Sequence, residues 1–544
     1  MNRREALKKV IPIAKHNYIK PNNTLMPYTG NWTFSEAAHL LRRTIYGPTF
    51  HQIKTATENG LAATISQLFI VQDLPEPPIY YDFSDDPNVP NGQTWVDNLL
   101  MGGGNIINQS RKRSLYAWMF GLMNEGGISI REKMVLFWHN HFVASSINQT
   151  QYLYDYIQTI RQHALGNFRT LAEEISISPA MLEYLNGNTN IKDAPNENYA
   201  RELLELFTIG KGELAGEGDY THFTEQDVIA IARAFTGWRS IDWENPEIIA
   251  GFYEAEQHDT TAKQLSHRFD YAIIENNDEN EYKDVIDIIL QQDETARFVC
   301  RQLHIWFVGS DISSDVEINV IAPMAQILRD NNYEVQPALQ ALLQSEYFFQ
   351  ESLRACMIAH PIDFIFKMVN SLHIVMPTNL LKRYQCWRNL NKKAIKDGMS
   401  LFILPNVAGW KAFYQEPLYY KYWINSASLL IRNAFVNQFM NGITVGGHLL
   451  KIDALAVIAQ LDNPSEPNEL IEQLSQILFA FPISQEQKDI LKNILIPGLP
   501  DFEWTVEYSD YLANPDDIAK ENAIRTKLEA MFLFLLKMPE MQLI

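Results

Sequence analysis

Cysteine is scarce in this chain of 544 residues, which contains only Cys300, Cys356 and Cys386. The count is odd, and no two cysteines have the CxxC spacing. A disulfide-bonded scaffold and a thiolate zinc site are therefore excluded as organising principles of the fold. We expect each cysteine to be a small buried apolar residue.

Long apolar runs are also absent. The strongest, Ala530–Leu536, is far shorter than the roughly 18–20 residues that a transmembrane helix needs, so we predict no membrane span. At the N-terminus, Asn2–Lys9 resembles the start of a twin-arginine export signal, but the apolar core after it is only Val10–Ala14. The chain as written indicates a cytoplasmic protein. A working signal would instead make it periplasmic or envelope-associated.

Positively charged residues are in deficit: the chain has 45 Lys and Arg residues but 65 Asp and Glu residues, which gives a formal net charge of -20. Such a surface repels phosphate backbones, so nucleic acid is a poor partner. The one basic cluster, Arg111–Arg113, is predicted to be a solvated helix face.

HExxH, GxSxG and P-loop motifs are missing. A di-iron helical bundle needs two Glu-x-x-His elements, and only Glu36–His39 has that spacing.

Helical periodicity dominates the chain, and alternating β patterns are few. Thr33–Glu36 reads as a capping box that opens a helix ending near Gly47. Further helices are predicted at 106–124, 128–141, 149–164, 167–186, 196–208, 224–236, 281–291, 293–308, 316–329, 335–347, 361–373, 419–438, 452–461, 467–480, 485–494 and 519–537. We predict a mainly α protein with a large multi-helical globular core, long loops and little β structure.

The predicted domains are an N-terminal tail at 1–25, a helical core domain at 26–380 and a C-terminal helical subdomain at 381–544, packed on the core. The boundary is placed where the helical pattern becomes irregular, at 376–418. Two long loops are expected, at 76–97 and at 209–222, and the second contains four glycines. Loops of this kind often contain functional residues, because a rigid scaffold positions them.

The richest polar motif is Asn196–Leu206. At about 100° per residue, one arc of the predicted helix collects Glu197, Arg201, Glu202 and Glu205 with Asn198. Glu197 with Arg201, and Arg201 with Glu205, are i,i+4 neighbours that can form ion pairs. Two interpretations stay open. The arc is a solvated face with ion pairs, or it lines a polar cavity whose carboxylates bind a metal or move protons.

A second motif, Phe137–Phe142, contains His139 and His141 on a helix that is apolar almost all round, which indicates burial. Residues two apart on a helix point in nearly opposite directions, so these two histidines cannot chelate one ion from a regular helix. Each is either a core histidine with hydrogen-bond partners or, alone, a metal ligand or proton carrier.

A third cluster comprises His258, Asp259 and Lys263, in a region with little periodicity. Adjacent His and Asp residues in a loop suit acid–base chemistry or metal ligation. They also suit a surface turn, which is the interpretation that we favour.

These segments follow one another in a recognisable order. The residues involved are Ala38–Arg43 with Tyr46–Pro48, Phe137–Phe142, Asn196–Leu206, Tyr220 with Thr224–Val228, Ala234–Trp238, Phe252 with His258–Asp259 and Lys263, Asn406–Trp410, and Met538–Leu543. Over about residues 30–544 the chain resembles the bacterial family known as domain of unknown function 1800. The chain departs from it at Phe207, where family members often have His.

The resemblance implies no activity. It does imply frequent export and a partner, because the genes of this family often neighbour those of a sulfatase-like family, domain of unknown function 1501.

Two functions compete. In the first, the chain is a scaffold or assembly component whose polar residues form a structural ion-pair network. In the alternative, segments 139–141, 196–205 and 258–263 converge on one cavity of a metal-dependent hydrolase or oxidoreductase. The candidate metal ligands are then His139, His141 and His258, which would bind a divalent transition metal. The candidate cavity lining is Glu197, Arg201, Glu202, Glu205, His258, Asp259 and Lys263.

Overall fold

The structure is a computed structural model that describes residues 24–81, 86–98, 106–241 and 249–544. Helices dominate these residues, so the predicted mainly α class is confirmed. Strands in the described residues form four two-stranded antiparallel sheets. They are β1 (Leu214–Gly216) with β2 (Asp219–Tyr220), β3 (Trp238–Arg239) with β4 (Phe252–Tyr253), β5 (Lys263–Gln264) with β6 (Ile273–Ile274), and β7 (Ile443–Val445) with β8 (His448–Leu450). The first of these sheets lies inside the predicted loop 209–222.

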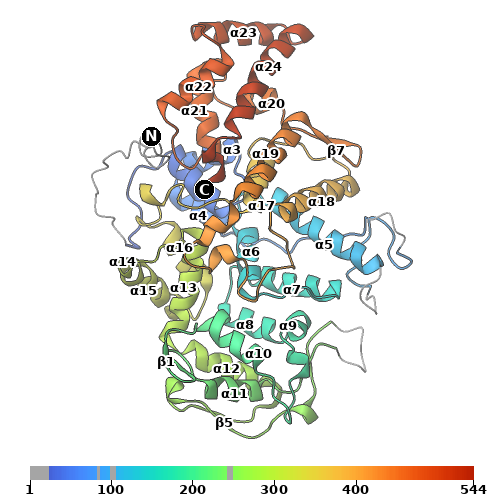
Figure 1. The fold of residues 1–544 in the computed structure, drawn as a ribbon, viewed down its shortest axis with the longest axis vertical. Helices are drawn as coiled ribbons and strands as arrows, with labels where there is room; N and C mark the ends of the chain where they lie inside the picture. Colours follow the sequence, from blue (N-terminus) through green and yellow to red (C-terminus); the bar gives the residue numbers. More distant parts are fainter. Residues whose placement is uncertain (1–23, 82–85, 99–105, 242–248) are drawn as a thin grey trace, which may run out of the picture.

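The molecule is elongated, and a central group of helices lies between two helical ends (Figure 1). The central helices are α2 (Phe34–Thr44), α3 (Phe50–Asn59), α4 (Leu61–Leu68), α5 (Ile106–Glu125), α6 (Arg131–His141), α7 (Thr150–Gln162), α13 (Asp293–Phe307), α14 (Ser314–Val316), α15 (Ala322–Asp330), α16 (Val335–Leu343), α17 (Pro361–Val369), α18 (Leu380–Lys396) and α19 (Ser426–Asn441). A π-helix, η6 (Glu317–Ile321), joins α14 to α15.

One end of the molecule contains α8 (Phe168–Ser176), α9 (Pro179–Tyr184), α10 (Glu197–Glu202), the π-helix η2 (Leu203–Thr208), α11 (Glu225–Ala234) and α12 (Glu281–Leu290). The opposite end contains α20 (Ala454–Ile458), α21 (Pro467–Leu478), α22 (Gln485–Leu495), α23 (Phe502–Ala513) and α24 (Ile518–Leu535) (Figure 1). The polar motif 196–206 and the cluster 258–263 therefore belong to the same end, whereas His139 and His141 lie on a central helix.

The start of α2 confirms the predicted capping box. Thr33 has extended backbone and caps the helix, and Glu36 accepts a hydrogen bond from the backbone N–H of Thr33 at 3.1 Å. These bonds satisfy backbone donors that a helix N-terminus otherwise leaves unpaired. The helix ends at Thr44, close to the predicted stop.

The prediction of irregular structure at 376–418 is wrong for its first half, because α18 occupies Leu380–Lys396. Asn379 caps it by accepting from the N–H of Lys382. Its buried face includes Asn391 and Lys393 beside Trp387, and these polar residues interrupt the apolar pattern by which a helix is recognised. Helices α3, α4 and α23 were also not predicted.

The division into domains at 380–381 stays a prediction. Contacts do cross it: the Arg432 guanidinium donates to the carbonyl of Ala359 at 2.9 Å, and Lys367 Nζ donates to the carbonyl of Leu543 at 2.7 Å. Residues on the two sides of this boundary are therefore in direct contact.

The sequence led us to expect that the basic cluster Arg111–Arg113 on α5 is a solvated face. This prediction is wrong for Arg111. Arg111 is fully buried and donates two hydrogen bonds to Asp86, at 2.9 and 2.8 Å. The surface loop 76–97, in the part that the structure describes, supplies this carboxylate. A buried guanidinium is tolerable only with such a partner, and local sequence gives no sign of it.

Three other sequence predictions can be compared with the structure. Within the described ranges no helix is both long and apolar enough to cross a bilayer. The three cysteines are unpaired; Cys300 and Cys386 are buried, and Cys356 is half-buried. The twin-arginine-like segment lies outside the residues that the structure describes.

Candidate functional site

His139 lies in the core on α6 with no exposed surface. Its Nε2 accepts from the backbone N–H of Phe402 at 3.2 Å, so its proton is on Nδ1, which donates to the Tyr156 hydroxyl at 3.0 Å. That hydroxyl donates in turn to the carbonyl of Phe142 at 2.6 Å. Burial lowers the pKa of His139 to about 3. The imidazole is therefore neutral, and both of its nitrogens are engaged by protein groups.

His141 points to a different part of the chain. Its Nε2 donates to the carbonyl of Phe207 on η2 at 2.8 Å, and burial lowers its pKa to about 4. The Phe207 side chain is itself fully buried, with its ring centre 5.4 Å from that of Phe142. His139 and His141 therefore bond to different parts of the chain, as expected for residues two apart on a helix.

Asn140, between the two histidines, joins two of the sequence motifs. Its Oδ1 accepts the backbone N–H of Trp410 at 2.9 Å. Gly409 sits directly on Asn140: a Cβ at Gly409 would lie 2.7 Å from the Asn140 carbonyl oxygen, and its φ is +85°. Only glycine fits this close approach at positive φ. The motifs Phe137–Phe142 and Asn406–Trp410 are therefore packing partners of each other.

The polar arc on α10 forms ion pairs near the surface. Arg201 donates to Glu197 at 3.0 Å and to both oxygens of Glu225, at 2.8 and 2.7 Å. Glu205 instead pairs with Lys211, at 3.2 and 3.3 Å. The pairing of Arg201 with Glu197 is confirmed, whereas the expected pairing of Arg201 with Glu205 is wrong.

The π-helix explains this difference. From Leu203 the backbone changes to i→i+5 hydrogen bonds, so the turn is wider and the 100° spacing no longer holds. Glu205 is thereby rotated away from Arg201. Glu202 is half-buried, and burial raises the pKa of its carboxyl.

The third cluster has a buried core that the sequence did not reveal. His258, Lys263 and Glu281 are all essentially without exposed surface. One oxygen of Glu281 is 3.0 Å from His258 Nε2, and the other forms an ion pair with Lys263 Nζ. His258 Nδ1 donates to the carbonyl of Thr236 at 2.9 Å. We call His258, Lys263 and Glu281 the buried triad.

Asp259 lies beside this triad but turns outward. Its carboxylate accepts from Arg233 at 2.7 Å and from the backbone N–H of Thr261 at 2.9 Å. Burial opposes ionisation, but these hydrogen bonds hold the pKa of Asp259 well below its usual range. The predicted surface turn therefore describes Asp259, and it does not describe His258 or Lys263.

The triad predicts a pH dependence of stability. Burial by itself lowers the pKa of His258, but the hydrogen bonds with Glu281 and Thr236 outweigh it and raise the pKa above its usual value. The stabilisation is then complete below the unfolded-state pKa of about 6.5 and is lost as the pH rises through the higher folded-state pKa. We expect His258→Gln to cost more free energy of unfolding at pH 6 than at pH 9, measured by urea denaturation. An equal cost at both pH values would contradict a charged His258.

The nine predicted site residues differ in the groups to which they bind. They divide into His139, His141, the ion pairs of α10 and η2, and the buried triad with Asp259, and the hydrogen bonds of each group go to different partners. His141 contacts the backbone of η2, while Glu205 on the same π-helix reaches the more exposed Lys211. Among the described residues no three His, Cys, Asp or Glu side chains are grouped so that they could hold a metal ion.

An open groove of about 610 Å³ is lined by none of the nine predicted residues. It lies where loop 209–222 meets α13, and His222 is in its wall. His222 Nδ1 donates to the carbonyl of Gly210 at 3.0 Å, and its Nε2 is 4.0 Å from Glu294. Glu294 in turn pairs with Arg301. The sequence patterns did not single out His222 or Glu294. They did indicate that the glycine-rich loop 209–222, to which His222 belongs, is of a kind that often contains functional residues.

The model of the family described as "Protein of unknown function (DUF1800)" matches residues 39–543. No curated protein and no solved structure matched the chain.

Proposed function

The chain belongs to the family described as "Protein of unknown function (DUF1800)", and on that premise we propose that it is a helical scaffold or assembly component. Its polar motifs then hold helices and loops together, and its surface is what partners recognise. An enzyme of the kind considered above would need the three polar segments around one cavity.

The observation that supports the scaffold is that the polar side chains of the motifs hydrogen-bond to groups on other helices and segments. His139 bonds Tyr156 and Phe402, and Asn140 bonds Trp410, so the Phe137–Phe142 motif connects α6, α7 and the 402–410 segment. The buried triad connects α12 with β5 in the same way. Buried polar groups with complete hydrogen bonding specify one packing arrangement, which is the role of a structural network.

The partner that the family resemblance implies is a sulfatase-like protein of the domain of unknown function 1501 family. With a net charge of -20, copies of this chain repel one another, which favours a different protein over self-association. Sedimentation velocity of the chain mixed with such a neighbour-encoded protein tests this, with a heavier complex as the expected result.

The alternative, a metal-dependent hydrolase or oxidoreductase, is tested by metal analysis of protein purified without chelator or affinity metal. We expect the purified protein to contain no transition metal in stoichiometric amount that is lost when His139 or Glu197 is replaced. His139→Ala should lower the free energy of unfolding by about 2 kcal/mol, because it leaves the Phe402 N–H unpaired and opens a small cavity. Glu197→Gln should change it by less than about 1 kcal/mol, because Glu197 is 42% exposed.

The two variants control for each other, because one removes a buried group and the other an exposed one. A transition metal present in stoichiometric amount and lost in both variants would support the enzyme and refute the scaffold.

A further inference from the structure

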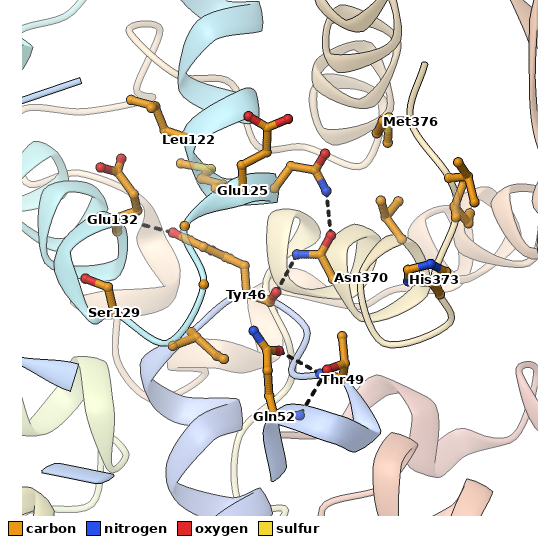
Figure 2. A pocket seen from close by; sticks show the side chains of 18 residues that line it. Tyr46, Thr49, Gln52, Leu122, Glu125, Ser129, Glu132, Asn370, His373 and Met376 are labelled. Carbon is orange, nitrogen blue, oxygen red and sulfur yellow. Dashed lines mark hydrogen bonds between the residues drawn. The ribbon is translucent and has the colours of Figure 1, made fainter. Parts of the chain in front are cut away.

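A second cavity, of about 320 Å³, lies between the turn after α2, the C-terminal end of α5 and the end of α17 (Figure 2). Its wall includes Tyr46, from the motif Tyr46–Pro48 that the functional proposal above leaves unused. Gly47 has φ +62° and packs against the backbone carbonyl of Phe366, so this turn is held in place by α17. Figure 2 shows Tyr46, Gln52, Asn370 and His373 around the space.

A chain of fixed amides forms one side of the cavity. Trp387 Nε1 donates to Asn124 Oδ1 at 3.1 Å, Asn124 Nδ2 donates to Asn370 Oδ1 at 2.6 Å, and Asn370 Nδ2 donates to the Tyr46 carbonyl at 2.7 Å. An indole N–H can only donate, so it sets the orientation of each amide that follows. Each amide nitrogen carries a second hydrogen, and no hydrogen bond found among the described residues uses it.

The charges around the cavity are already balanced. Its acidic lining residues are Glu125 and Glu132. Glu132 accepts from Arg161 on both oxygens at 3.0 Å, and Glu125 accepts from Arg383 at 2.6 Å. No lysine or arginine is among the lining residues in the described part of the chain. An anion would therefore find no lysine or arginine in the lining to pair with, and a cation would find carboxylates that are already paired with arginines.

Apart from the His373 imidazole, the side chains that remain for a ligand are uncharged. Gln52, Ser129 and the two asparagines offer amide and hydroxyl groups, and Leu122 and Met376 offer apolar surface. Ligand pockets typically combine a few oriented polar groups with apolar walls in a volume of about 300–1,000 Å³. A side-chain amide has both a hydrogen-bond donor and an acceptor, and so does a hydroxyl group. A ligand with several hydroxyl groups can therefore use both sides of these amides, whereas a ligand that only accepts or only donates cannot.

We propose that this cavity binds a small neutral polyhydroxylated molecule of the size of a monosaccharide. The proposal does not depend on the scaffold function, because it rests on a cavity that none of the predicted site residues lines.

The test uses the full chain with D-glucose, D-galactose and N-acetyl-D-glucosamine, in saturation-transfer NMR and calorimetric titration. Val375 lines the cavity but is 61% exposed, so Val375→Trp should narrow the opening without disturbing the core. The matched control is Val506→Trp on α23, which is 59% exposed and far from the cavity. Glucose 6-phosphate tests the charge argument.

We expect at least one of the three sugars to bind, with affinity at least tenfold weaker in Val375→Trp and unchanged in Val506→Trp. Glucose 6-phosphate should bind at least tenfold more weakly than glucose. Three outcomes overturn the proposal: no saturation transfer to any sugar, equal binding by the two tryptophan variants, or tighter binding of the phosphate.

Discussion

Replacing Glu281 with leucine is expected to lower the free energy of unfolding by about 3–5 kcal/mol, the typical cost of leaving a buried charge without its partner. Glu281 is the shared carboxylate of the buried triad, and its side chain has no exposed surface. Without it, Lys263 has only the carbonyl of Asp259 to bind, and His258 loses the acceptor at Nε2. Urea denaturation at pH 7 measures the change.

Two further variants identify the cause. Glu197→Leu removes a carboxylate from an exposed ion pair and should cost less than about 1 kcal/mol. Glu281→Leu combined with Lys263→Met removes both charges, and because a well-packed apolar replacement of an ion pair is often neutral, the double variant should be more stable than Glu281→Leu alone. If the double variant is as unstable as the single one, lost packing explains the effect and lost charge balance does not.

Replacing Gly409 with alanine is expected to cost about 3 kcal/mol. Part of this is the cost of a left-handed backbone for a residue with a Cβ, about 1–2 kcal/mol. The rest comes from overpacking against the buried backbone of Asn140, typically about 1–3 kcal/mol, since the new Cβ would lie 2.7 Å from its carbonyl oxygen. Thermal or urea unfolding of the variant measures the sum.

Gly398 provides a matched control, because its φ is +96° and nothing lies within 4 Å of where a Cβ would be placed. Gly398→Ala should therefore show the backbone cost alone. Equal destabilisation by the two substitutions would mean that the contact between Gly409 and Asn140 does not hold the two motifs together. A larger cost at Gly409 supports the view that these motifs are structural.

Much of the secondary structure could be predicted because it depends on near neighbours. The capping box at Thr33 and the helices at 106–124, 281–291 and 485–494 follow from residues three or four positions apart. The same rule explains the confirmed pair of Glu197 and Arg201. It failed at Glu205, where the π-helix widens the turn, and at α18, where buried polar residues hide the apolar face.

The candidate site could be predicted only as a set of residues. The sequence indicated that His139 and His141 are buried and point apart, but it could not give their partners. Phe402, which donates to His139, is 263 positions away along the chain, and Phe207, which accepts from His141, is 66 positions away. Such contacts depend on how helices cross, which no local pattern encodes.

By itself the sequence determined the helical class, the family and the absence of a long apolar segment, because composition, periodicity and ordered motifs are properties of the chain alone. Only the tertiary structure decided what the polar residues do. A buried donor or acceptor must be satisfied by whatever group packing brings within about 3 Å. Packing brought Glu281 to Lys263, Lys211 to Glu205 and Trp410 to Asn140. It also placed Tyr46 and the loop 209–222 beside cavities that the sequence could not show.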